Sequence, residues 1–276
     1  MTETYDQALR WAAGELAGRN DADGARYVLE IRGGFSPSGL QLHRGDAMPP
    51  ALWAQFQEDV ARLQNNEPPQ YIVGVAPFYG DLFNVTPAVL IPRFETEELV
   101  AWAAEDEANA TSGLDVGTGS GVIGLTLAQL LPNCRMTLSD VSAAALAVAQ
   151  RNATRLKRQA TFVQSDLFAA LGDQRFDFVI ANLPYIARSE TPVMDASTLK
   201  FEPGLALFAE EEGLALFRAF TEQVGAHLTP GGCVYLEFGY HQQPALAALF
   251  AAAVPEATAT FRQDMAGHPR MVRLAF

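Results

Sequence analysis

From about residue 90 onward, short apolar runs typical of β-strands alternate with segments whose apolar residues recur at helix spacing. This alternation limits the fold more than any other feature of the chain, because strands separated by helices pair into a mostly parallel sheet with helices on both faces. We therefore predict an α/β fold. The expected strands cover residues 113–116, 135–139, 161–164, 176–181, 233–238, 258–263 and 271–276, and the expected helices cover residues 96–104, 122–131, 143–156, 214–228 and 245–253.

The part of the chain before residue 90 has a different character. Apolar residues at helix spacing from Tyr5 to Leu16 and from Leu52 to Leu63 predict a small helical domain over residues 1–66, with a loop over residues 33–39. Two β-rich runs, residues 71–74 and 78–83, predict a β-hairpin linker over residues 67–88. The α/β domain then covers residues 89–276.

Composition and charge argue against several classes of protein. The net charge of −13 repels a polyphosphate over most of the surface, so no direct nucleic-acid partner is expected. The chain lacks an apolar run long enough to span a membrane, and its acidic first residues lack the basic start of a signal peptide, so we expect a cytoplasmic protein. Cys134 and Cys233 are interpreted as small buried hydrophobic residues, and the four histidines lack metal-ligand spacing.

A glycine-rich turn follows the first strand of the α/β domain. It consists of Gly117, Thr118, Gly119, Ser120 and Gly121, and it opens a helix. Glycines permit a tight turn and let a ligand approach the backbone. Residues 119–124 also fit the dinucleotide pattern G-x-G-x-x-G, so an NAD-dependent oxidoreductase is one alternative.

Aspartates at three successive strand ends favour a different ligand. Asp115 directly precedes the glycines, where a carboxylate disfavours a pyrophosphate but suits an ammonium group. Asp140 ends the next strand and can accept both hydroxyls of a ribose, and Asp166 ends the third strand and can accept from an adenine amino group. S-adenosylmethionine carries all of these groups, so we predict that it is the cofactor. Each aspartate on its own could also be an ordinary turn residue, because Asp is common where a strand ends in a turn.

The fourth strand delivers Asn182, Leu183, Pro184 and Tyr185 to the same edge of the sheet. The Asn182 side-chain oxygen can accept one N–H bond from a planar NH2 group, a backbone carbonyl in the turn can accept the other, and the Tyr185 ring can cover the flat face. Two such acceptors fix the direction of a weakly nucleophilic amide nitrogen and stabilise the positive charge that it acquires on methylation. An ordinary strand-ending turn would use similar residues, so the prediction depends on the glycine turn upstream.

With these motifs, the chain resembles the release-factor glutamine N5-methyltransferases over nearly its whole length. The resemblance is specific before residue 100 and around Glu202, whereas the glycine turn and the Asn182 motif are shared by many amino-methyltransferases. The matching segments are residues 69–74, 78–80, 90–97, 114–121, 165–166, 182–185, 202–207, 212–214 and 236–239.

The resemblance implies methyl transfer from S-adenosylmethionine to the glutamine of the Gly-Gly-Gln motif in peptide chain release factors. It also implies a seven-stranded Rossmann-like sheet with one antiparallel strand near the C-terminus, and a helical N-terminal domain that helps to bind the substrate protein. Residues 117–121 and Asp140 carry over as donor-binding residues, and Asn182 and Tyr185 as substrate-amide residues. We expect the protein to act as a monomer.

The chain departs from the family pattern at a few positions. Leu183 replaces the first proline of Asn-Pro-Pro-Tyr, although Pro184 still holds Leu183 extended. Phe94 replaces a proline, and Leu167 stands where relatives often have a tryptophan beside the adenine. These changes concern rate and substrate range more than reaction type.

Other readings remain open on the sequence alone. Glu95 and Glu97 also suit a plain helix start, Glu202 also suits a loop anchor, and the helical domain could serve stability alone. The rival functions are an amino-methyltransferase acting on DNA, RNA or a ribosomal-protein glutamine, and a non-catalytic S-adenosylmethionine-binding protein.

Overall fold

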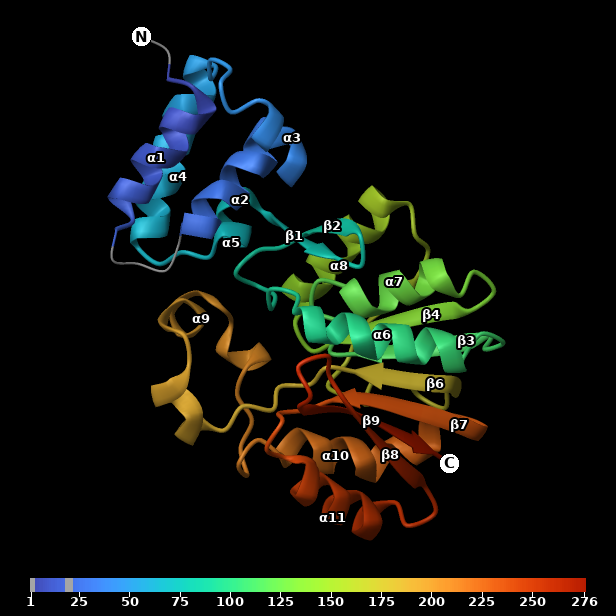
Figure 1. Ribbon diagram of the computed structural model, residues 1–276. Helices are drawn as coiled ribbons and strands as arrows, with labels where there is room; N and C mark the ends of the chain where they lie inside the picture. Colours follow the sequence, from blue (N-terminus) through green and yellow to red (C-terminus); the bar gives the residue numbers. More distant parts are fainter. Residues whose placement is uncertain (1–2, 18–21) are drawn as a thin grey trace. The chain divides into compact units, whose positions relative to one another are not determined.

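The computed structural model describes residues 3–17 and 22–276 (Figure 1). The chain divides into two compact units, each with its own core. Unit 1 comprises Met1–Val75 together with Asp195–Phe201, and unit 2 comprises Ala76–Met194 and Glu202–Phe276. Among the described residues, no helix is long and apolar enough to cross a membrane.

Unit 1 is helical, as the apolar spacing predicts. A capping box between Thr4 and Gln7 begins α1, and the core gathers apolar side chains such as Val28, Phe56 and Leu63. Helix α9 belongs to this unit, and the Lys200 ammonium donates to the backbone carbonyl of Asn65 at 3.1 Å. The helices are α1 (Tyr5–Glu15), α2 (Ala22–Gly33), α3 (Pro37–Leu42), α4 (Pro50–Gln64), α5 (Pro69–Val73) and α9 (Ala196–Phe201).

Two sequence-based assignments in this region are wrong. The expected loop over residues 33–39 contains the start of α3, because Ser36 caps the helix and Pro37 takes its first position. The expected strand over residues 71–74 is helix α5, which begins at Pro69 and ends at Gly74 in a left-handed conformation. The β-hairpin pairs β1 (Val75–Phe78) with β2 (Asp81–Asn84).

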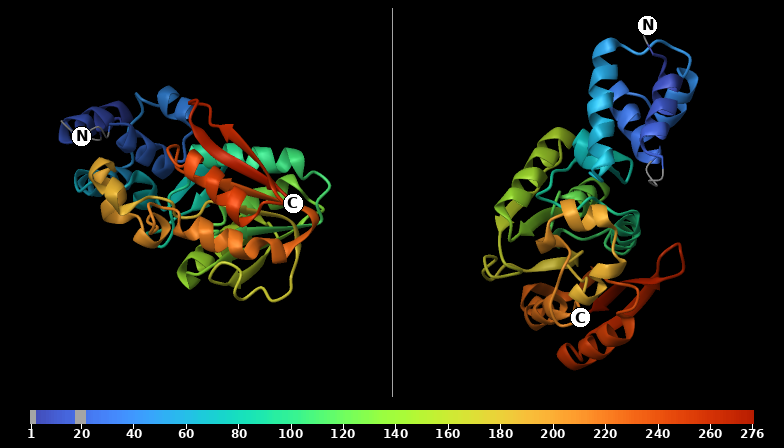
Figure 2. Two further views of the ribbon diagram at one scale, coloured as in Figure 1. Left: turned by 90° about the horizontal axis from the view of Figure 1, so that it is seen from below. Right: turned by 90° about the vertical axis from the view of Figure 1, so that its left-hand side faces the viewer.

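Unit 2 is built on a seven-stranded sheet with the order β5-β4-β3-β6-β7-β9-β8. Strands β3 to β7 pair in parallel, and β9 runs antiparallel to both of its neighbours, as expected for one antiparallel strand near the C-terminus. Figure 2 shows this last pair of strands, β8 and β9, in red. The strands are β3 (Ser112–Val116), β4 (Arg135–Asp140), β5 (Thr161–Gln164), β6 (Phe176–Ala181), β7 (Leu228–Glu237), β8 (Thr258–Gln263) and β9 (Pro269–Ala275).

Helices cover both faces of this sheet (Figure 1). Alternate residues of β6 pack into different cores: Val179 and Ala181 face the cluster that includes α10 and α11, whereas Phe178 and Ile180 face the cluster that includes α6 and α7. Helices α10 and α11 lie on one face, and α6, α7 and α8 lie on the other. Their bounds are α6 (Phe94–Asp106), α7 (Val122–Leu130), α8 (Ala143–Leu156), α10 (Ala215–Val224) and α11 (Gln243–Ala253), with a short 3-10 helix at Arg188–Val193.

The order of the strands explains where a ligand can bind. The chain builds β4 and then β5 on one side of β3, and returns to place β6 on its other side. Such a reversal opens a crevice beyond the carboxyl ends of the central strands. The glycine turn and Asn182 follow β3 and β6 directly, so the topology brings them together.

Candidate active site

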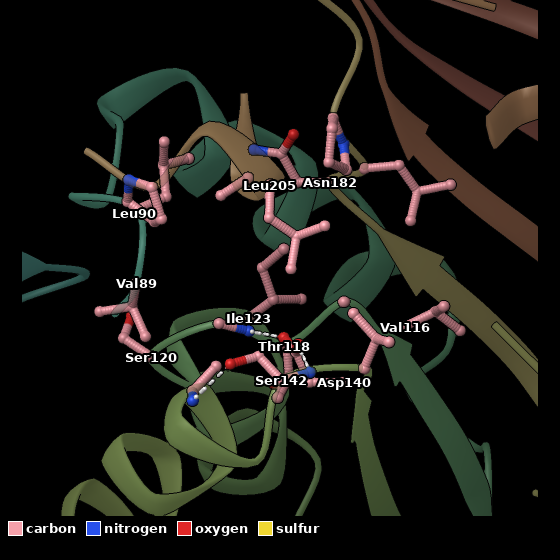
Figure 3. A pocket seen from close by; sticks show the side chains of 18 of the residues that line it. Val89, Leu90, Val116, Thr118, Ser120, Ile123, Asp140, Ser142, Asn182 and Leu205 are labelled. Atoms are coloured by element: carbon pink, nitrogen blue, oxygen red, sulfur yellow. Dashed lines mark hydrogen bonds between the residues drawn. The ribbon is translucent and has the colours of Figure 1, made fainter. Parts of the chain in front are cut away.

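A pocket of about 440 Å³ lies at this switch point. Val116, Asp140 and Asn182 line it from the carboxyl ends of β3, β4 and β6. Leu90, from a loop, and Leu205, from the short 3-10 helix Gly204–Ala206 of the same unit, also line it. Figure 3 shows Asn182 and Leu205 on one side of the pocket, with Thr118 and Asp140 on the opposite side.

The glycine turn forms one wall of the pocket. Gly117, Gly119 and Gly121 all have positive φ angles, of 72°, 56° and 84°, which side chains other than glycine rarely adopt. A Cβ atom on Gly119 would meet nothing within 4 Å, whereas one on Gly121 would lie 3.0 Å from Leu125. The N–H groups of Gly117 and Thr118 both donate to the Ser139 carbonyl, which holds the turn against β4. Gly117, Thr118, Gly119 and Ser120 line the pocket, whereas Gly121 is not among the described lining residues.

Asp115 lies beneath the glycine turn and is not among the described residues that line the pocket. Its Oδ2 accepts from the Thr118 hydroxyl at 2.6 Å and from the Gly124 N–H at 2.9 Å, and its Oδ1 has no hydrogen-bond partner among the described residues. Burial is the main reason that its pKa rises to about 7. The side chain points below the turn toward the start of α7, and a direct contact with a ligand ammonium group stays a prediction.

Asp140 lies in the pocket wall, and its contact with a ribose stays a prediction. Its two oxygens accept from the N–H groups of Gly119 and Ser142, at 2.9 and 2.8 Å, so the carboxylate also holds the turn in place. Burial raises its pKa, and these two hydrogen bonds oppose the shift. Asp166 and Leu167 line the pocket as well, and Leu167 has the unusual φ of 45° for a non-glycine residue.

The Asn182 motif is divided between the pocket and the core. Asn182, Leu183 and Pro184 line the pocket. The Leu183 side chain is 3% exposed and belongs to the apolar core that includes α10 and α11. Its Cδ2 lies 3.5 Å from the place of a Cβ on Gly117, so leucine fits this position against the glycine turn.

Tyr185 is not among the described residues that line the pocket. Its hydroxyl donates to Oε1 of Glu237 at 3.2 Å, and burial together with the Glu237 charge raises its pKa. The structure thus places the Tyr185 hydroxyl in a buried polar network, and an approach of its ring to a substrate stays a prediction.

Thr96 and Glu237 form hydrogen bonds behind Asn182, and the sequence predicts no role for either residue. Asn182 Nδ2 donates to Thr96 Oγ1 at 3.2 Å, and Thr96 Oγ1 donates to Glu237 Oε2 at 2.6 Å. Glu237 is 1% exposed and ends strand β7, and burial raises its pKa. An acidic residue inside the apolar run 234–238 was the signal in the sequence, because a buried charge needs specific partners.

Glu202 holds two loops of the pocket together. Its Oε2 accepts from the Ile91 N–H at 3.1 Å, and its Oε1 accepts from the Arg93 guanidinium at 2.6 Å. Arg93 and the neighbouring Pro203 both line the pocket. The loop-anchor interpretation of Glu202 therefore describes what this side chain does.

The residues of the pocket fit S-adenosylmethionine. The bare backbone at Gly119 gives a ligand close access, and Asp140 and Asp166 supply carboxylate acceptors. The apolar side chains of Val141 and Leu167 lie among them and suit an adenine ring. The described part of the chain contains no group of acidic, histidine and cysteine side chains that could hold a metal ion.

Comparison with known proteins gives the class and then the family. A crystal structure of a methyltransferase from Pyrococcus furiosus superposes with a TM-score of 0.55 at 16% identity, over 79% of this chain and 98% of that chain, which supports the fold. The family model "Methyltransferase small domain" matches residues 95–199, and the model "PrmC N-terminal domain" matches residues 7–74. Fold, pocket and these matches define an S-adenosylmethionine-dependent methyltransferase of class I.

Proteins of similar sequence show to which family within this class the chain belongs. The release factor glutamine methyltransferase of Enterococcus faecalis is 37% identical over 275 residues, which is 98% of this chain and 99% of the relative. That of Lactococcus lactis is 45% identical over 212 residues, covering 76% of this chain and 78% of the relative. The chain belongs to the release factor glutamine methyltransferase family.

Proposed function

We propose that this protein methylates the side-chain amide nitrogen of the glutamine in the Gly-Gly-Gln motif of a peptide chain release factor. One observation carries the proposal: the carboxamide of Asn182 and the glycine turn line the same pocket. The names of the relatives supply the substrate class.

The residues of the pocket have separate tasks in this reaction. S-adenosylmethionine, when bound, supplies an electrophilic methyl group. Gly117, Gly119, Asp140 and Asp166 bind the donor, and Asp115 acts indirectly by holding Thr118 and the start of α7. Asn182 Oδ1 and a backbone carbonyl of the turn accept the two hydrogens of the glutamine amide. These two acceptors direct the nitrogen and stabilise the positive charge that develops on it, and its proton passes to water afterwards.

The proposal also covers the roles of the domains, the oligomeric state of the enzyme and its location in the cell. Residues 1–66 form a domain that helps to bind the release factor, residues 67–88 link it, and residues 89–276 carry the catalytic machinery. The enzyme acts as a monomer in the cytoplasm and does not bind nucleic acid. The net charge of −13 supports this last point, because it opposes contact with phosphates.

The decisive experiment uses labelled donor and a purified release factor. We expect label in the factor with Gly-Gly-Gln and none in a factor with Gly-Gly-Ala. Naked DNA and a ribosomal protein that carries exposed glutamines serve as alternative substrates. Label that persists with Gly-Gly-Ala, or that enters DNA alone, would contradict the proposal.

Asn182→Ala tests the role of the carboxamide. This change removes an acceptor that contacts the substrate, so we expect turnover to fall by at least about a thousandfold. The dissociation constant of the donor, measured by calorimetry, should change by less than about threefold. Near-normal methylation by this variant would rule out the proposed mechanism.

A further inference from the structure

A buried chain of hydrogen bonds stands behind Asn182. Its amide nitrogen lies 3.2 Å from Thr96 Oγ1, and this hydroxyl lies 2.6 Å from Glu237 Oε2. Thr96 is 3% exposed and lines the pocket at its wall, and Glu237 is 1% exposed, so bulk water has little access to these bonds. The three residues come from α6, from the end of β7 and from the residue after β6.

The direction of these bonds follows from the chemistry of the groups. The Thr96 hydroxyl donates its one proton to Glu237 Oε2, as an ionised carboxylate requires, because such a group accepts hydrogen bonds and cannot donate. Thr96 Oγ1 is then left as an acceptor for Asn182. Only the NH2 end of the Asn182 amide can supply that proton, and the Oδ1 end is thereby turned away from Thr96.

Burial raises the pKa of Glu237, and several groups around it oppose that rise. The Tyr185 hydroxyl donates to its other oxygen at 3.2 Å, and the positive charge of Arg270 on β9 acts on it. Arg270 is itself paired with Asp264 at 3.2 Å, and Glu95 on α6 contributes an opposing negative charge. Two hydroxyl donors and one cation therefore face a single buried carboxylate.

We propose that Thr96 and Glu237 are positioning residues that fix the orientation of the Asn182 amide, so that Oδ1 is presented to the substrate. An amide free to rotate by 180° would present NH2 to the glutamine NH2 for part of the time, and two donors repel. The hydrogen-bonded chain from Asn182 through Thr96 to Glu237, called the relay below, therefore selects substrates that carry an NH2 group beside Asn182. This inference rests on the proposed function, because it assumes an amide nitrogen as acceptor of the methyl group.

Thr96→Val breaks the relay with little change of shape. We expect kcat to fall about tenfold or more, while KM for the release factor and the donor dissociation constant change by less than about threefold, because valine has nearly the volume of threonine at this point of the pocket wall. Thr96→Ser keeps the hydroxyl and should restore most of the lost kcat. Thr126→Val is the matched control: Thr126 is also buried, its hydroxyl has no hydrogen-bond partner among the described residues, and its loss should leave kcat unchanged.

A spectroscopic readout tests the relay without turnover. The side-chain amide protons of Asn182, assigned by their loss in Asn182→Ala, should exchange slowly with water in the wild type and in Thr96→Ser. They should exchange faster by about tenfold or more in Glu237→Gln and Thr96→Val, and the Glu237 variant provides the test if Thr96→Val does not fold.

The outcomes separate the two ideas. A wild type that leaves Gly-Gly-Gln unlabelled overturns the proposed function, and the exchange measurement still decides on the relay. Equal kcat for Thr96→Val and wild type, equal exchange rates, or a Thr96→Ser variant as slow as Thr96→Val would each overturn the relay.

Discussion

At the scale of single residues, two glycines of the same turn have different reasons to be glycine. Gly119 faces open space in the pocket, whereas Gly121 packs against Leu125 and Ala149. Both have positive φ, so an alanine at either position costs about 1 kcal/mol in backbone strain. The difference between them lies in what the new methyl group would meet.

We expect Gly119→Ala to weaken donor binding by about tenfold or more and to lower the unfolding free energy by about 1 kcal/mol. Gly121→Ala should lower the unfolding free energy by about 2 kcal/mol or more, because strain and close contacts add. Calorimetry with S-adenosylmethionine and urea unfolding measure the two effects. The same stability loss in both variants, with equal donor affinity, would contradict this assignment.

Asp115 should make stability depend on pH. Its pKa rises from 3.8 to about 7 on folding, so the folded state holds the proton more tightly than the unfolded state. This contribution to stability is complete below the ordinary aspartate pKa and is lost as the pH rises through about 7. Between about pH 5 and 8, the unfolding free energy of the donor-free wild type should fall by about 2 kcal/mol relative to Asp115→Asn. Parallel urea-unfolding profiles for the two proteins would refute the prediction.

At the scale of elements, Glu202 joins the loop before α6 to the loop after α9 through Ile91 and Arg93. We expect Glu202→Ala to lower the unfolding free energy by about 2 kcal/mol, because it removes hydrogen bonds to a buried carboxylate. Both loops should also become more sensitive to limited proteolysis. Glu210→Ala is the control, since its exposed pair with Arg188 contributes less than about 0.5 kcal/mol. Similar losses for the two variants would contradict the anchoring role.

Elements were predictable from sequence where local pattern and tertiary environment agree. The strand over residues 176–181 and the helix over 143–156 have the predicted bounds, since the apolar spacing that defines them is also what the core buries. Residues 71–73 have high β propensity but form α5, because Pro69 and Gly74 set the helix ends. The hydrogen bond between Thr96 and Glu237 could not be predicted, because these two residues lie 141 positions apart in the chain.

At the scale of the whole molecule, two cores predict two separable unfolding transitions. The complete pocket belongs to unit 2, so the donor should stabilise this unit and leave unit 1 unchanged. At about a hundred times its dissociation constant, S-adenosylmethionine should add about 2.7 kcal/mol to the unfolding free energy of unit 2.

Tryptophan fluorescence can follow each unit. Trp11 and Trp53 pack in unit 1, and Trp102 is buried in unit 2. A variant with Trp11→Phe and Trp53→Phe reports on unit 2, and Trp102→Phe reports on unit 1. S-adenosylmethionine should shift the unfolding transition that reports on unit 2 and leave the transition of unit 1 in place. NAD at the same concentration should shift neither transition. A single transition, or an equal shift in both signals, would contradict the division.

The path of the chain through the two units affects how the protein is made. Unit 1 is interrupted after Val75 and takes in Asp195–Phe201 much later in the chain. A ribosome therefore synthesises strands β3 to β6 before the α9 segment leaves the exit tunnel. A nascent chain stalled before residue 195 carries a helical unit without α9. The N-terminal unit, although translated first, is thus completed only when most of the message has been read.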